Sequence, residues 1–358
     1  MQVNLVLRKF SVRRSQSFMS PRNTTLVSYA VFFIVLAVIG CLHLSAVCLT
    51  VLFACLALHK LDFWNRRWLS VLLFLILMGL VFSGFVLFLR KAITVLPGIV
   101  SNSIRGIVQF AGDHDIELPF ADNVDNLKDL AVDTVKSNLS YLQNFATLAT
   151  KEFVFQAVSV VVAIGIFMNS EPEFPSSDPT KRTLYELFYS AIIGRFTSFY
   201  WSFERVMGAQ FVISLINTIL TSFFILICCL CYPKLVNYAG VLIILTFVCG
   251  MLPIIGNILS NSIIVGLAFT VSPKLAIIGL VFLVAIHKLE YFLNSKIIGD
   301  RIRHPMWLML LALLMGERLL GIPGIILAPV ILCFIKIELT KFEVGLDGAV
   351  IKVREMEI

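Results

Sequence analysis

The sequence predicts an all-α, polytopic integral membrane protein. Of its 358 residues, 59% are hydrophobic and only 14% are charged, whereas about 25% of the residues in a typical soluble domain are charged. The apolar residues form long continuous runs, which favour membrane-spanning helices over the alternating strands of a barrel. We expect about seven to eight hydrophobic segments, two of them broken by proline and glycine.

The N-terminal part is expected to be a basic arm, residues 1–25, followed by membrane spans within residues 26–89. The arm carries five basic residues and no acidic one, which places it in the cytoplasm under the positive-inside rule. The 26–58 run is long enough for two short spans, with a tight turn expected near Gly40 and His43. A third span is expected over 69–89.

Residues 90–151 are the one sizeable polar insertion, and their acidic cluster suits an external position. Within this insertion apolar residues recur every three to five positions, the pattern of an amphipathic helix, at Val124, Leu127, Leu130, Val135, Leu139 and Leu142. We expect this helix to pack on the membrane domain. A separate binding domain is the alternative.

A membrane transport core is predicted over residues 152–336, followed by a cytoplasmic tail, 337–358. Its apolar runs cover 152–168, 209–231, 235–271, 275–295 and 306–336. Charges mixed with aromatic residues over 181–208 predict a helix lying at the level of the lipid headgroups. The eight cysteines fall in or beside apolar runs, so we expect small packing residues and predict neither disulfides nor a metal site.

Two of these runs are interrupted, the first by Gly250–Asn257 and the second by Gly316–Gly324. Proline has no N–H to donate, so Pro253 is expected to free the carbonyl of Cys249 and Pro323 that of Leu319. Freed backbone groups at membrane depth are tolerated where they line a cavity or are buried in protein. The runs therefore form either kinked spans or two re-entrant hairpins that meet in mid-membrane, the hypothesis we favour.

Ionisable side chains accompany the broken runs. Glu317 and Arg318 lie well inside 306–336, where a charge at the bilayer centre costs about 2.5–3.5 kcal/mol on insertion scales. Because neighbouring positions diverge on a helix, each is expected to need another partner, with Glu290 the counter-charge for Arg318. His287, Glu290 and Asn294 share one helix face, either for proton transfer or as the snorkelling end of a span.

These motifs together resemble the autoinducer-2 exporter (AI-2E) family of permeases. The resemblance rests on Pro253, Gly256, His287, Glu290, Asn294, Lys296, Gly299, Arg303, His304, Pro305, Gly316, Gly321, Pro323, Gly324 and Pro329. His287 stands where the family usually has glutamine. The resemblance implies a bacterial cytoplasmic (inner) membrane and export of small polar molecules, the quorum signal autoinducer-2 in some members. Other members resemble sodium or lithium/proton antiporters.

The sequence thus predicts a secondary transporter for a small polar molecule, driven by an ion gradient. It contains no Gly-Lys dipeptide, so it lacks the phosphate loop of an ATPase, and neither enzyme activity nor a cofactor is predicted. Sodium or lithium/proton antiport and a non-transporting structural or regulatory role are the alternatives. The expected partners are membrane lipids, a small polar solute, H+ or Na+, and a second copy of the chain, but no nucleic acid.

Two groups of residues are assigned from these arguments. The predicted solute or ion pathway contains Pro253, Gly256, Asn257, His287, Glu290, Asn294, Glu317, Arg318, Gly321, Pro323 and Gly324. The predicted structural motif positions are Lys296, Gly299, Arg303, His304, Pro305, Gly316 and Pro329. Both termini are expected in the cytoplasm.

Overall fold

The computed structural model describes residues 21–63, 66–115, 126, 128–134, 136–137, 151–169, 184–253, 255–298, 305–344 and 350–352. The helices are α1 (Pro21–Cys41), α2 (Ser45–Lys60), α3 (Arg67–Asp113), α5 (Lys151–Met168), α6 (Leu184–Cys231), the 3-10 turn η2 (Pro233–Leu235), α7 (Val236–Gly250), α8 (Ile255–Val271), α9 (Pro273–Ile298), α10 (Met306–Leu320) and α11 (Ile322–Thr340). The predicted helical class is confirmed. One short antiparallel pair, β1 (Phe342–Val344) with β2 (Val350–Lys352), is added at the C-terminal end.

The long helix α6 organises the fold. It is 48 residues long and unbroken, whereas the sequence had predicted a headgroup helix over 181–208 and a separate span over 209–231. The predicted division into two segments was wrong, because the helix contains no proline that would interrupt it. Several of its polar residues bind partners within the protein. For example, Arg195 contacts Glu338, and Gln210 donates to a main-chain carbonyl.

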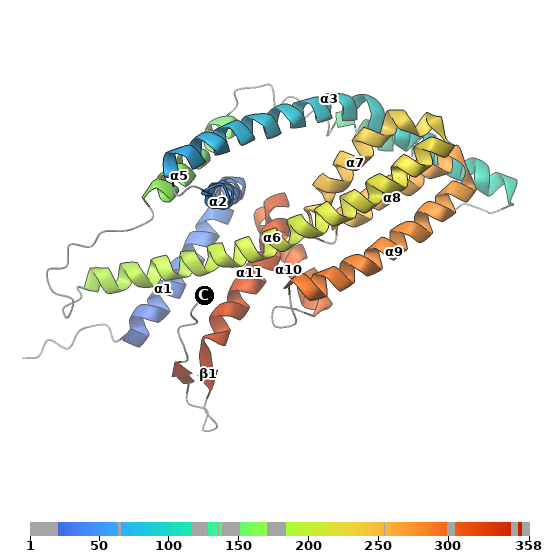
Figure 1. Ribbon diagram of the computed structural model, residues 1–358. Coiled ribbons are helices and arrows are strands. Elements are labelled where there is room, and N and C mark those ends of the chain that lie inside the picture. Colours follow the sequence, from blue (N-terminus) through green and yellow to red (C-terminus); the bar gives the residue numbers. More distant parts are fainter. Residues whose placement is uncertain are drawn as a thin grey trace, which may run out of the picture.

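The other helices pack along α6 in two groups (Figure 1). Helices α1, α2 and α11 contact its N-terminal half through a cluster that includes Phe32, Phe203 and Phe334. Helices α7, α8 and α9 surround its C-terminal half, and α3 arches over α7 and α8 (Figure 1). One continuous helix therefore joins these two packed regions, and a third apolar cluster lies where α2, α3 and α5 meet.

The first apolar run turns where the sequence predicted. The chain bends by 118° between α1 and α2, and His43 between them adopts a left-handed backbone conformation with φ of 55°. A β-carbon on Gly40 would lie 3.0 Å from Cδ2 of Leu320, so the bend docks closely on the end of α10.

Fewer helices meet the length and composition of a membrane span than the seven to eight segments predicted. In the part of the chain that the structure describes, three helices qualify, Arg67–Asp113, Tyr185–Cys231 and Ile322–Thr340, or four if the bent pair α1–α2 counts as one span. The predicted runs 152–168 and 235–271 correspond to shorter apolar helices, Phe153–Met168, Val236–Gly250 and Gly256–Val271. The predicted number of segments is therefore not confirmed.

The remaining boundaries also differ in detail. Helix α3 continues beyond the predicted span 69–89 to Asp113, and α11 continues past residue 336 to Thr340. Residues 128–134 of the predicted amphipathic helix are helical, but Leu130 is 67% exposed. Its other predicted apolar positions, Val124, Leu127, Val135, Leu139 and Leu142, lie outside the described residues.

Candidate functional site

Both predicted interruptions separate two helices. Helix α7 ends at Gly250 and α8 begins at Ile255, while α10 ends at Leu320 and α11 begins at Ile322. Between α10 and α11 only Gly321 intervenes, with φ of 68°. Glycine reaches this region at little cost, which explains how one residue reverses the chain.

Each break exposes a terminal carbonyl that accepts a hydrogen bond from a distant helix. Gln210 Nε2 on α6 donates to the Gly250 carbonyl at 2.6 Å, and Ser45 Oγ on α2 donates to that of Leu320 at 2.8 Å. The sequence predicted the free carbonyl one residue earlier at each break. At the first break, the Cys249 carbonyl instead accepts the N–H of Leu252 at 2.8 Å, because the chain closes one tighter turn before it leaves the helix.

Glycines allow the chain to pack tightly at both breaks. A β-carbon on Gly256 would overlap the carbonyl oxygen of Cys249, and one on Gly324 would overlap that of Gly316. The α7–α8 turn and the α10–α11 hairpin therefore bring backbone against backbone. This close approach gives Gly256, Gly316 and Gly324 a steric role.

Beside the first break lies a group of buried polar side chains that we call the polar belt. It comprises Gln210, Ser214, Asn217 and Thr221 of α6, Thr246 of α7, and Asn257 and Ser260 of α8, each no more than 8% exposed. Asn217 Nδ2 lies 3.3 Å from Asn257 Oδ1, and Ser214 Oγ donates to the Phe247 carbonyl at 2.8 Å. The belt thus links three helices through polar contacts.

The belt offers neutral hydrogen-bonding chemistry. Its amides each carry donors and an acceptor, its hydroxyls can do either, and none of its side chains is charged at neutral pH. Such groups match the hydroxyl, carbonyl or amide groups of an uncharged polar molecule. Within the described residues, no three His, Cys, Asp or Glu side chains form a cluster suited to a metal ion.

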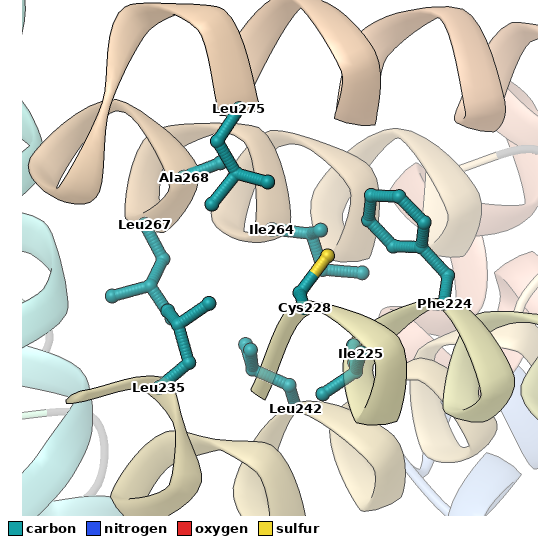
Figure 2. Close-up of a pocket in the computed structure, with 9 residues that line it drawn as sticks. All are labelled: Phe224, Ile225, Cys228, Leu235, Leu242, Ile264, Leu267, Ala268 and Leu275. Carbon is teal, nitrogen blue, oxygen red and sulfur yellow. The ribbon is translucent and has the colours of Figure 1, made fainter. Parts of the chain in front are cut away.

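A small apolar cavity lies next to the belt, between α6, η2, α7, α8 and α9. Figure 2 shows its nine lining residues, which include Phe224, Cys228, Leu242 and Leu267. Its volume is about 20 Å³, close to the space that one water molecule needs. An apolar space of this size does not hold a polar solute. The belt is therefore bordered on this side by apolar packing.

The structure places one predicted pathway residue, Asn257, in the polar belt, 5% exposed and beside Asn217. Pro253 and Gly256 shape the turn that precedes it, and Gly321, Pro323 and Gly324 form the second break. The two breaks are connected by packing. Met251 at the first and Leu320 at the second both contact the apolar cluster around Met207 of α6.

Glu317 and Arg318 do not join the belt. Their side chains are 49% and 83% exposed on α10, and Arg318 Nε lies 3.6 Å from Glu317 Oε2. The two side chains approach each other because long side chains can bend together although their β-carbons diverge, and the side chain of Glu290, the expected counter-charge for Arg318, lies outside the described residues. Leu314 and Leu319 beside them are also exposed.

Of the predicted polar face of α9, the structure describes the side chain of His287. His287 is exposed, whereas the buried face of α9 is apolar and includes Leu283 and Ile286. Pro305 immediately precedes α10, and Pro329 is buried within α11. The side chains of Glu290, Asn294 and Lys296, together with residues Gly299, Arg303 and His304, lie outside the described residues.

The sequence reasoning missed two groups of residues. The belt residues of α6 were recognisable, since Gln210, Ser214, Asn217 and Thr221 are four, three and four positions apart in an apolar run, the spacing of one helix face. The other group surrounds Glu338, whose partner Arg195 is 143 residues away in sequence. No local sequence pattern predicts that pairing.

Comparisons with known proteins agree with this architecture. The family model described as AI-2E family transporter matches residues 24–343. A protein of Bacillus subtilis (strain 168) that bears the name "Putative transport protein YdbI" is 25% identical over 279 residues, covering 76% of this chain and 75% of that protein. No solved structure matches the chain. Because the family match extends from α1 to β1 and takes in both breaks and the polar belt, this multi-pass membrane protein belongs to the AI-2E family of transporters.

Proposed function

We propose that this protein is a secondary transporter that moves a small, uncharged polar molecule across the cytoplasmic membrane, and that the polar belt is part of its pathway. One observation carries the proposal, the burial of seven neutral hydrogen-bonding side chains between α6, α7 and α8. Buried polar groups are costly in an apolar surrounding unless they are paired. Their concentration where α6, α7 and α8 meet supports a role in binding.

The position of the belt beside an interrupted helix supports the same role. Transporters commonly bind substrate where discontinuous helices expose main-chain groups near the bilayer midplane. Here Asn257 lies in the first turn of α8, and Gln210 and Ser214 bind carbonyls in the last turn of α7. In this proposal, hydrogen bonds to the solute replace some of these hydrogen bonds within the protein, so the belt side chains remain paired when the solute binds.

The proposed energy source is an ion gradient, with His287, Glu290 and Glu317 as the coupling candidates that the sequence offers. Sodium or lithium/proton antiport is the second candidate. It is favoured by the uncharged oxygens gathered at the belt, those of Asn217, Asn257 and the last carbonyls of α7. Cation exchange also requires a group that releases a proton, which the belt itself does not contain.

Flux into sealed proteoliposomes tests the proposal. We expect wild-type protein to carry one or more neutral polar solutes from a panel of labelled polyols, sugars and amides, and to do so faster with a proton or sodium gradient. Asn217→Ala should lower this flux by about tenfold or more, as expected for the loss of one buried hydrogen-bonding partner.

Ser262→Ala is the matched control, because Ser262 lies on the exposed side of α8 and bonds only within its own helix, to the Ile258 carbonyl. It should leave the flux unchanged. Cation exchange without solute flux would favour antiport. No flux of any solute or cation in the panel would contradict transport altogether.

A further inference from the structure

Three helices meet around one buried carboxylate near the start of α1 and the end of α11 (Figure 1). The side chain of Glu338 is 5% exposed, and its Oε2 accepts the hydroxyl of Tyr29 at 2.6 Å and contacts Nη1 of Arg195. Its Oε1 lies 2.6 Å from Nζ of Lys341, which also donates to Ser198 Oγ at 2.9 Å. We call these five residues the ionic layer.

The guanidinium group strengthens this connection between helices. Arg195 of α6 lies over the ring of Tyr29 of α1, 4.1 Å from its centroid, and donates to the Tyr29 hydroxyl at 2.9 Å. One carboxylate of α11 therefore holds donors from both other helices. With two cations and one anion, the ionic layer has a net charge of +1.

One helical turn further into the molecule, the same three helices contribute an aromatic layer. Phe32 of α1, Phe199 of α6 and Phe334 of α11 are at most 3% exposed. The ring centroid of Phe32 lies 4.7 Å from that of Phe334 and 5.5 Å from that of Phe199. Positions three or four apart share a helix face, so the two layers are stacked along the same interface.

Apolar packing continues from the aromatic layer to the level of the polar belt. Phe203 and Met207 of α6 pack with Leu327 and Val330 of α11, all at most 2% exposed. The next turn of α6 brings Gln210, the first belt residue. Along α6 the order is therefore ionic layer, apolar layers, polar belt.

We propose that the ionic and apolar layers together form a gate, with Glu338 as the residue that holds it shut. This inference rests on the proposed transport function. A solute that leaves the belt past the ionic layer must part α11 from α1 and α6, since their side chains fill the interface. In the closed gate the carboxylate has dry, direct partners, and in the open gate water replaces them.

Water makes such a gate reversible. A buried charge that loses its partner without hydration is strongly destabilising, but exposed ion pairs contribute little because water solvates both ions. The ionic layer lies near the helix ends, and Lys341 is already 33% exposed. The closed state is thus favoured while the layer is dry, and opening is compensated as water enters.

The net positive charge sets the direction of a test. In Glu338→Gln the charges of Arg195 and Lys341 remain, and their mutual repulsion acts across the interface of α6 and α11. The variant should favour the open gate. Glu204→Gln is the matched control, since it makes the same change at a glutamate of α6 that pairs with a lysine, Lys60, at 2.6 Å, outside the ionic layer.

A native thiol reports on the interface. Cys333 of α11 is 1% exposed, directly precedes Phe334 of the aromatic layer in sequence, and contacts the side chain of Ser202 on α6. Cys55 of α2 is 5% exposed and belongs to a different cluster, against Ala163 of α5. The rate at which a small uncharged maleimide modifies each thiol can be measured by peptide mass spectrometry on the full-length protein in lipid vesicles.

We expect Cys333 to react about tenfold faster in Glu338→Gln than in wild type, the change that one charge-assisted hydrogen bond gives in a two-state equilibrium. Cys55 should be unchanged, and Glu204→Gln should match wild type at both thiols. An unchanged rate at Cys333 would overturn the gate. So would an equal rise at Cys55, which would show general loosening.

The labelling experiment needs no solute, so its failure is distinct from failure of the transport proposal. Faster labelling of Cys333 in a protein that carries no tested solute or cation would leave the gate in place and remove the proposed cargo. Flux in wild type, together with a Cys333 labelling rate that Glu338→Gln does not change, would leave the transport proposal in place and remove the gate.

Discussion

The hydroxyl of Ser45 donates to the main-chain carbonyl of Leu320 at 2.8 Å, across 275 positions of sequence. Ser45 is the first residue of α2, directly after the bend from α1, and Leu320 is the last of α10, directly before the turn into α11. The bend between α1 and α2 therefore supplies a hydrogen-bond donor to the break between α10 and α11, although the two lie at opposite ends of the chain. The N-terminal bend is part of the same assembly as the C-terminal break.

Replacing Ser45 by alanine should destabilise the protein by about 1 kcal/mol, because the Leu320 carbonyl loses its donor in a partly buried contact. Thermal unfolding in detergent, followed by intrinsic fluorescence, measures the effect. Ser262→Ala, which removes an exposed hydroxyl bonded within its own helix, should leave the midpoint unchanged. Equal shifts in the two variants would argue against a special role for the contact between the bends.

Gly256→Ala should destabilise the α7–α8 turn by about 3 kcal/mol or more, since the new methyl group overlaps the backbone of α7 at the Cys249 carbonyl and the turn must open. Gly84→Ala is the control. Nothing lies within 4 Å of a β-carbon at Gly84 in the middle of α3, so the change should stabilise the helix by about 0.5–1 kcal/mol. A Gly256→Ala protein as stable as wild type would contradict the described turn.

The amides of Asn217 and Asn257 should be energetically coupled. Asn217→Leu and Asn257→Leu each leave one buried amide without its 3.3 Å partner, at a cost of about 1–3 kcal/mol apiece. The double variant removes both amides, so its loss of unfolding free energy should be smaller than the sum of the losses in the two single variants. Urea unfolding of the four proteins in micelles gives the coupling energy.

Ser70→Ala provides the comparison for that cycle. Ser70 bonds Asp62 at 3.0 Å near the start of α3 and shares no partner with Asn217, so combining the two changes should be additive. Additivity of the two asparagine variants would mean that their contact contributes nothing.

Two ion pairs on α6 should differ greatly in their contribution to stability. Arg195→Met leaves Glu338, 5% exposed, without its closest cation, and should cost about 3–5 kcal/mol. Lys60→Met disrupts a pair whose lysine is 68% exposed, and should cost less than about 1 kcal/mol. Unfolding midpoints at low and at high salt distinguish the pairs, because salt screens only the exposed one. Similar costs in both variants would contradict the buried character of the ionic layer.

Helix-breaking residues made the interruptions predictable, whereas their partners depended on the fold. The turn near Gly40 and His43 and both proline–glycine breaks are confirmed, because local backbone chemistry determines them. Which carbonyl accepts a hydrogen bond depends on how tightly the last turn closes. For that reason the acceptors are Gly250 and Leu320 in place of the residues before them.

The partners of charged residues were not predictable from the sequence for a related reason. Arg195 lies among aromatic residues that are typical of the headgroup region, yet its carboxylate partner comes from α11, and only the packing of α6 against α11 brings them together. Glu317 and Arg318 were expected to need partners because their surroundings in sequence are apolar. The face of α10 that carries them is not covered by the described part of the chain.

The contact between Gly316 and Gly324 has a mechanical consequence. The backbones of α10 and α11 are in direct contact there, with no side chain between them. We therefore expect the two helices to move together at this junction. Helix α11 has 19 residues and so extends for about 28 Å at 1.5 Å per residue. A rotation of a few degrees about the Gly316–Gly324 contact would thus displace the C-terminal end of α11 by an ångström or more, enough to separate Glu338 from Arg195.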